Sequence, residues 1–133
     1  MVTLQHAIKI AAPRARIYHA LTDIDAMAGW HLGAITGAIS KGDIFYLERR
    51  PGLRFGWRTD DLEVDQSVVQ TCVEGPGAQD GKRLTITLSD LPDARTLVEL
   101  NDEGWAEDHP HLALCNTYWG EALTNLKSYV EKA

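Results

Sequence analysis

A long helix is predicted at the C-terminal end of the chain, over Glu107 to Lys132. Its apolar residues recur at steps of three and four, at Leu112, Cys115, Trp119, Leu123, Leu126 and Val130. This spacing places them on one face of an α-helix. Pro110 suits the first turn of that helix, and Asp108 is a candidate N-cap. The apolar face must pack against the structure that the rest of the chain forms.

Most of the chain before this helix alternates between apolar and polar residues with a period of two, which is typical of half-buried strands. The first strand, Leu4 to Ile10, carries Leu4, His6, Ile8 and Ile10 on one face. Six further strands are predicted over residues 35–40, 44–49, 53–63, 68–74, 84–88 and 95–101. Residues 75–81 form a glycine-rich loop. Strands joined by such short connections pair antiparallel, because a parallel pair needs a long crossover.

Two short helices are predicted between the first and second strands. Pro13 suits the first position of one helix, where its missing N–H costs nothing. Asp23 or Asp25 caps the other, and Met27 and Trp30 lie on the same side of it. The order is therefore one strand, two short helices, six strands and one long helix. It predicts an α+β fold in which a curved antiparallel sheet of about seven strands wraps around the long helix, as a single domain over residues 1–133.

Composition excludes several classes of protein. The chain has 133 residues, a net charge of −6 and a pI near 5.2, so it lacks the positive charge that nucleic-acid binding requires. No apolar run is long enough to cross a membrane, and residues 1–10 do not resemble a signal peptide. Cys72 and Cys115 match no metal or redox spacing. We expect two reduced thiols in a cytoplasmic protein.

Several local motifs resemble the START-related, Bet v 1-like (SRPBCC) superfamily, which has a helix-grip fold. Within it, the chain is most similar to the family named after the activator of the 90-kDa heat-shock chaperone's ATPase. The similarity covers nearly the whole chain and is carried by Ile8 to Pro13, Ile17 to Asp23, Met27, Trp30, Leu62 to Asp65, Trp119 to Leu123, Leu126 and Tyr129. The resemblance implies a cavity between sheet and long helix. It does not by itself imply one function, because the superfamily includes carriers, polyketide cyclases and co-chaperone domains.

One position departs from the family pattern. Members usually carry Gly-Trp in the final helix, where this chain has Tyr118-Trp119. A tyrosine puts bulk where the helix approaches a strand or a partner. The fold prediction is unaffected, but the pocket and any dimer geometry are expected to differ from those of relatives.

The implied cavity has six candidate ligand-binding residues: Trp30, Phe55, Trp57, His111, Cys115 and Trp119. Phe55, Trp57 and Trp119 are equally consistent with plain core packing, because residues at strand or helix spacing usually just pack. Trp30 and Trp105 are expected at the rim. If Phe55 and Trp57 face inward, Arg54 and Arg58 face outward, because side chains alternate along a strand. The reverse register would bury unpaired guanidinium groups, which is costly.

Few residues suggest chemistry. His6 lies on the apolar face of its strand and reads either as a hydrogen-bonded interior residue or as an acid–base group. His109 and His111 have no third ligand at a recognisable spacing, so we expect neither a metal nor a cofactor. The acidic residues between Asp60 and Asp65 are typical of a solvated strand end. No nucleophile elbow, phosphate loop or dinucleotide motif is present.

Three functions follow as hypotheses. The first is a cytoplasmic, non-enzymatic domain that binds a small and mainly apolar ligand in the sheet–helix cavity. The second is a co-chaperone-like interaction module that activates a chaperone ATPase, and the resemblance also allows a homodimer. The third is an enzyme of the cyclase or hydratase type, with His6, His111 or Tyr118 as acid–base groups. Neither nucleic acid nor membrane is an expected partner.

Overall fold

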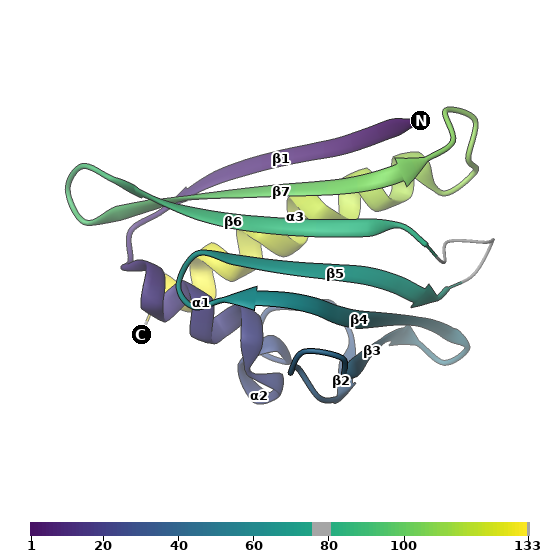
Figure 1. Ribbon diagram of the computed structural model, residues 1–133, viewed down its shortest axis with the longest axis horizontal. Helices are drawn as coiled ribbons and strands as arrows, with labels where there is room; N and C mark the ends of the chain where they lie inside the picture. Colours follow the sequence, from purple (N-terminus) through teal and green to yellow (C-terminus); the bar gives the residue numbers. More distant parts are fainter. Residues whose placement is uncertain (76–80, 133) are drawn as a thin grey trace.

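Seven strands and three helices make up the described part of the chain, residues 1–75 and 81–132 of a computed structural model (Figure 1). The strands are β1 (Val2–Ile10), β2 (Ala34–Gly37), β3 (Ile44–Arg50), β4 (Leu53–Glu63), β5 (Ser67–Glu74), β6 (Arg83–Leu91) and β7 (Arg95–Trp105). The helices are α1 (Arg14–Thr22), α2 (Ile24–Met27) and α3 (Leu112–Glu131). This is the predicted order of elements. Most of the loop predicted over 75–81 lies outside the described residues.

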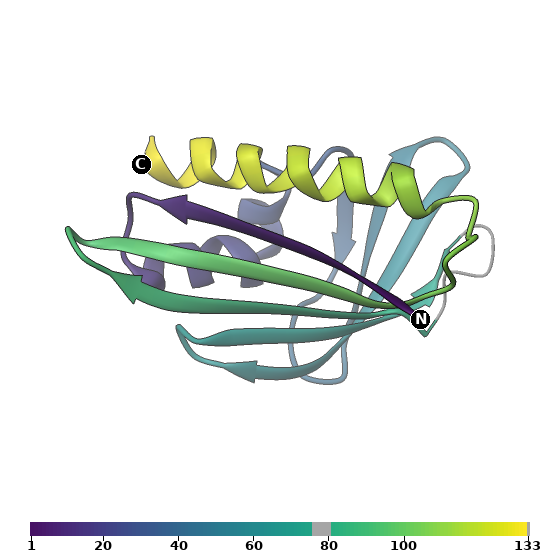
Figure 2. The ribbon, with the colours of Figure 1, turned by 90° about the horizontal axis from the view of Figure 1, so that it is seen from above.

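The strands form one antiparallel sheet in the order β1-β7-β6-β5-β4-β3-β2. Only β1 is out of sequence order, because its connection to β2 runs through α1 and α2 and leaves β1 to pair with β7. The sheet is strongly curved, and α3 runs across its concave side with its C-terminal end near α1 (Figure 2). The predicted fold, a curved seven-stranded sheet wrapped around a long C-terminal helix, is confirmed.

The core lies between the concave face of the sheet and one face of α3. On the helix, Trp119, Leu123, Leu126 and Val130 are buried, whereas Leu114 is 65% exposed. On the sheet, burial alternates along most of β5 and over the first six residues of β6. The periods of 3.6 and two that predicted these elements therefore also identified most of the residues that face the core.

The start of the long helix was predicted wrongly. It was expected by Glu107 with Asp108 as its N-cap, but α3 begins at Leu112 and its N-cap is His111, whose side chain makes no capping hydrogen bond. Residues 106–112 instead form two backbone-closed turns, which contain Pro110. Residues 107–111, at the start of the predicted helix, contribute no residue to its apolar face. Packing against the core therefore does not stabilise them as helix.

The end of the last strand was also predicted wrongly. It was expected at Asn101, but β7 continues to Trp105. Its extra residues pair with both neighbours, since Leu4 of β1 and Leu84 of β6 lie opposite Asp102. Burial continues to alternate through Leu100 and Asp102, so the extension adds a buried carboxyl to the concave face.

The two short helices lie between β1 and β2 as predicted, but α2 ends at Met27, before Trp30, which was expected on the same helix. Pro13 is the N-cap of α1 rather than its first residue. Asp23 is the cap of α2, where its carboxylate accepts a hydrogen bond from the backbone N–H of Ala26. Trp30 lies in the turns after α2, and its indole N–H donates to the carbonyl of Ala20 in α1 at 2.9 Å. This bond fixes the corner between the helices.

The predicted register of β4 is confirmed. Arg54 and Arg58 point to the outer face, where they form ion pairs with Glu74 and Asp60 at 3.5 and 2.8 Å. Phe55 and Trp57 consequently point to the concave side. Asp60 also accepts a hydrogen bond from the Thr71 hydroxyl, so this carboxylate belongs to the outer surface of the sheet.

Candidate functional site

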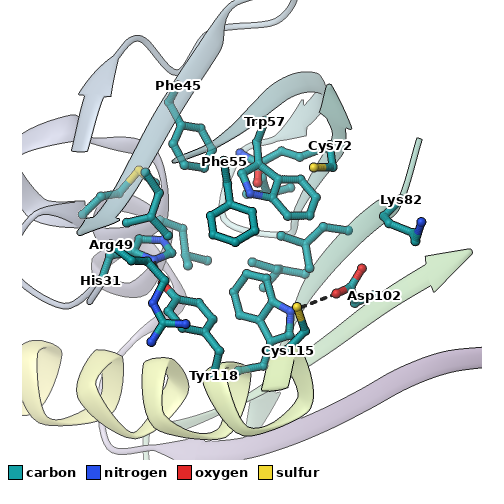
Figure 3. A pocket seen from close by; sticks show the side chains of 18 of the residues that line it. His31, Phe45, Arg49, Phe55, Trp57, Cys72, Lys82, Asp102, Cys115 and Tyr118 are labelled. Atoms are coloured by element: carbon teal, nitrogen blue, oxygen red, sulfur yellow. Dashed lines mark hydrogen bonds between the residues drawn. The ribbon is translucent and has the colours of Figure 1, made fainter. Parts of the chain in front are cut away.

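A cavity of about 50 Å³ lies between the concave face of the sheet and the first half of α3 (Figure 3). Strands β3 to β7, the α1–α2 corner and α3 all contribute to its walls. Most of the wall is apolar or aromatic, and all four tryptophans of the chain, Trp30, Trp57, Trp105 and Trp119, take part in it.

The aromatic wall is built from three directions. Phe45, Phe55 and Trp57 come from the strands β3 and β4, because inward side chains recur at every second residue. Trp119 comes from α3, and its ring meets that of Trp57 edge to face with centroids 6.4 Å apart. Such a contact between aromatic rings is favourable beyond the area it buries.

One side of the cavity lies next to solvent and is formed by His31, Arg49 and Tyr118. We call this side the mouth. Arg49 is exposed, whereas Tyr118 is only 8% exposed. The Arg49 guanidinium carbon lies 4.7 Å from the centre of the Tyr118 ring, a cation–π distance. The Tyr118 hydroxyl lies 2.5 Å from Nδ1 of His31, which in turn stacks on Trp30. The mouth is thus closed by side chains from β3, α3 and the turn after α2.

Burial determines the protonation states of His31 and Tyr118 at the mouth. It lowers the pKa of His31 to about 3, so this imidazole is neutral near pH 7. In the neutral tautomer that carries its proton on Nε2, Nδ1 accepts a hydrogen bond from the Tyr118 hydroxyl. Burial also raises the pKa of Tyr118, against the backbone N–H of Leu32 and the charge of Arg49, which lower it. The pair is therefore held as imidazole and phenol.

The opposite side of the cavity, called the closed end below, is formed by Lys82, Asp102, Trp105 and Trp119. Asp102 is 2% exposed, and its Oδ2 accepts a hydrogen bond from the Trp119 indole N–H at 3.0 Å. Figure 3 shows this bond reaching from β7 to α3. The Lys82 ammonium lies 5.1 Å from the centre of the Trp105 ring.

The groups around Asp102 offset part of the effect that burial has on its carboxyl. Burial raises the pKa of the Asp102 carboxyl, while the indole N–H groups of Trp119 and Trp105 and the charge of Lys82 act in the opposite direction. The net effect is a raised pKa. A buried carboxyl supported in this way is costly to leave without its partners.

Neither cysteine is an activated nucleophile. Cys115 lines the cavity, and burial together with the negative charge of Asp102 raises the pKa of its thiol to about 11. The thiolate, which is the reactive form, is therefore scarce at neutral pH. Cys72 is buried on β5 and donates to the carbonyl of Glu74 at 3.3 Å.

The structure brings together five of the six residues that the sequence suggested for the site. Trp30, Phe55, Trp57, Cys115 and Trp119 line the cavity, and His111, the N-cap of α3, is not among the lining residues. The expectation that Trp105 lies at the rim is wrong, because this residue is 1% exposed and belongs to the closed end.

The acid–base candidates are scattered. His6 lies outside the cavity, where its Nε2 is 2.9 Å from Oδ1 of Asn116. Of His6, His111 and Tyr118, only Tyr118 lines the cavity. Within residues 1–75 and 81–132, no group of three His, Cys, Asp or Glu side chains is placed to hold a metal ion.

Sequence reasoning missed the polar groups of the cavity, namely His31, Arg49, Lys82 and Asp102. For Asp102 a signal existed, since it continues the alternation set by Val98 and Leu100. For His31 the only signal was its place beside Trp30. Both residues find their partners on α3. Tyr118 is 87 residues from His31, and Trp119 is 17 residues from Asp102.

A curved antiparallel sheet closed by a C-terminal helix, with a cavity between them, defines the helix-grip class of domains. The family described as activator of Hsp90 ATPase homolog 1-like protein matches residues 11–131. This span is most of the chain, so the chain belongs to that family. Among the described residues, no helix has both the length and the apolar content needed to span a membrane.

Solved structures share the fold of this chain. The Aha1 dimer from Colwellia psychrerythraea is 27% identical, with a TM-score of 0.89 over 98% of this chain and 97% of that one. A Mesorhizobium loti protein is 17% identical, with a TM-score of 0.87 over 99% and 98% of the two chains. An Hsp90 activator from Plasmodium falciparum is 13% identical, with a TM-score of 0.82 over 98% and 97%. No curated protein matches the chain.

Proposed function

We propose that this protein binds a small, mainly apolar molecule in the cavity between the sheet and α3. The observation that carries the proposal is the composition of the wall, in which aromatic side chains surround a few convergent polar groups. Small-molecule sites are mostly apolar, with a small number of polar groups that orient the ligand. A core evolved only for packing has no need to bury a histidine, a lysine and an aspartate around one cavity.

The size of the cavity restricts the ligand and its route of entry. A volume of about 50 Å³ is far below the roughly 300 to 1,000 Å³ of sites for drug-sized ligands. The Tyr118 ring fills the mouth, at the position where the family resemblance implies a glycine. A ligand larger than a few atoms must therefore displace Tyr118 and the Arg49 side chain that covers it. Arg49 is exposed, so its movement costs little.

Intrinsic fluorescence tests this proposal directly, because all four tryptophans line the cavity. The protein is titrated with small aromatic compounds and with larger flavonoid, polyketide and lipid ligands. We expect the small compounds to change the emission of the wild type. The Tyr118→Ala variant, which opens the mouth, should also respond to larger ligands.

Tyr129→Ala is the matched control, since it removes a tyrosine from the far end of the same helix. Tyr129 is 39% exposed and does not line the cavity. Its response should equal that of the wild type. If no compound alters the emission of either the wild type or Tyr118→Ala, the cavity is not a ligand site.

A second candidate function is stimulation of a chaperone ATPase, and membership of the family favours it. The structural relative from Plasmodium falciparum is described as an Hsp90 activator, and the Colwellia relative as an Aha1 dimer. The test measures the ATPase rate of an Hsp90-type chaperone as this protein is added to saturation. Sedimentation of the free protein tests the homodimer. An unchanged rate at saturation removes this candidate and leaves the ligand-binding proposal untouched.

A further inference from the structure

Two buried polar atoms stand out at the closed end of the cavity. In residues 1–75 and 81–132, Oδ1 of Asp102 and Nε1 of Trp105 are the buried side-chain polar atoms that have no hydrogen-bond partner. Both residues line the same cavity, and they are 2% and 1% exposed. Buried polar groups in proteins are nearly always hydrogen-bonded, so two exceptions on one wall require an explanation.

The two atoms are neighbours, but they do not satisfy each other. The Trp105 N–H lies close enough to the Asp102 carboxyl to lower its pKa, yet no hydrogen bond of ordinary geometry joins them. The other oxygen of Asp102 is held by Trp119 from α3, which fixes the carboxyl in place. The closed end therefore presents an acceptor and a donor side by side, and neither has a hydrogen bond of ordinary geometry.

A hydroxyl group matches this pair. It can donate its proton to Oδ1 of Asp102 and accept from the Trp105 N–H at the same time. A cationic group fits poorly, because Lys82 and Arg49 already place positive charge on the wall. A carboxylate fits poorly as well, because it would face Asp102. The apolar remainder of the wall favours a neutral molecule that is aromatic or aliphatic beyond its hydroxyl.

We propose that Asp102 and Trp105 select ligands that carry a neutral hydroxyl, such as a small phenol or alcohol, and bind that hydroxyl at the closed end. This inference rests on the proposed function and names the chemical class of its ligand. The rest of the molecule points toward the mouth, between Phe55 and Tyr118. Asp102 and Trp105 are then specificity determinants, while the aromatic wall supplies binding that does not depend on the hydroxyl.

The decisive experiment compares phenol with toluene, which have nearly the same shape. Calorimetric titration is carried out on the wild type and on Tyr118→Ala. In a pocket without partners, toluene binds more tightly, because the phenol hydroxyl loses its hydrogen bonds to water. With both partners in place, we expect phenol to bind about tenfold more tightly than toluene, or better. The sign of the preference therefore reports on the proposal without any change to the closed end.

Two variants test whether Asp102 and Trp105 are responsible for the preference for phenol over toluene. Asp102→Leu removes the acceptor and Trp105→Phe removes the donor, and each should reduce the phenol preference while leaving toluene affinity within about threefold. Thermal unfolding identifies variants that still fold. If Asp102→Leu does not fold, Trp105→Phe and the wild-type comparison carry the test.

The outcomes distinguish failure of the hydroxyl preference from failure of ligand binding as a whole. Equal affinity for the two compounds, or tighter binding of toluene, overturns the hydroxyl preference and leaves the cavity as an apolar ligand site. Such a result would mean that Oδ1 of Asp102 and Nε1 of Trp105 are hydrogen-bonded only by a bound water. Binding of neither compound to the wild type or to Tyr118→Ala overturns the ligand-binding function and this inference together.

Discussion

The two ends of the cavity use buried polar groups in opposite ways. At the mouth, the Tyr118 hydroxyl and the His31 imidazole satisfy each other, and Arg49 covers the tyrosine ring. At the closed end, Asp102 is only half satisfied by Trp119, and Trp105 keeps a free N–H. Paired groups stabilise the closed conformation of the protein itself, whereas unpaired ones gain a partner only when something else binds. The mouth is therefore stable as it stands, whereas on the binding proposal the closed end gains its partners from the ligand.

The largest effect is expected from Trp119, which joins α3 to both the aromatic wall and Asp102. Trp119→Ala should lower the free energy of unfolding by about 3–5 kcal/mol, because it leaves a void and an unpaired buried carboxyl. Urea denaturation measures this loss. Leu114→Ala, on the exposed side of the same helix, is the control and should stay within about 0.5 kcal/mol of the wild type. Equal losses for the two variants would show that Trp119 does not anchor the helix.

The mouth should make stability depend on pH. The pKa of His31 is about 3 in the folded protein and near 6.5 when it is unfolded. Below pH 6.5 the unfolded chain takes up a proton that the folded chain does not, so stability falls as the pH falls. The loss should reach about 1.4 kcal/mol per pH unit between pH 6 and 5, above the range where carboxylates titrate.

Urea denaturation at several pH values measures this slope. His31→Gln keeps an acceptor for Tyr118 but does not titrate, so its slope should be flatter than that of the wild type by most of this amount. The same slope in both proteins would assign the acid sensitivity to other groups.

A smaller effect is expected from the Tyr118 hydroxyl alone. Tyr118→Phe keeps the ring under Arg49 but leaves Nδ1 of His31 without its donor. The free energy of unfolding should fall by about 1 kcal/mol. Because the ring still fills the mouth, the size of ligand that the protein accepts should not change, in contrast to Tyr118→Ala. Binding of larger ligands by Tyr118→Phe would indicate that the hydrogen bond, and not the bulk of the ring, closes the cavity.

The smallest effect on stability is expected from Arg49. Arg49→Ala removes an exposed cation–π contact and should change the free energy of unfolding by less than about 0.5 kcal/mol. Stopped-flow fluorescence should nevertheless show faster entry of a small aromatic ligand, because the cover over Tyr118 is gone. Arg54→Ala is the matched control, since Arg54 also lies over a tyrosine ring but on the outer face. An equal rate for the two variants would place the entrance elsewhere.

Much of the fold could be predicted from the periodicity of the chain. Alternation in β4 identified Phe55 and Trp57 as inward residues, and helical spacing identified Trp119 as facing the core. Both periods report on burial, so five of the six suggested site residues line the cavity. The prediction failed where burial and polarity disagree, at Asp102, which was left outside the last predicted strand. It failed also for His111, because the helix start depends on turns that carry no apolar pattern.

The amino-acid sequence alone determined the order of the elements, the inward face of each strand and the apolar face of α3. These follow from local geometry, because the backbone period assigns each side chain to one face. Only the tertiary structure decided which polar groups meet. His31 reaches Tyr118, and Trp119 reaches Asp102, because the curvature of the sheet brings α3 across it. Those meetings leave Oδ1 of Asp102 without a partner, and no local pattern encodes the distance between side chains on separate elements.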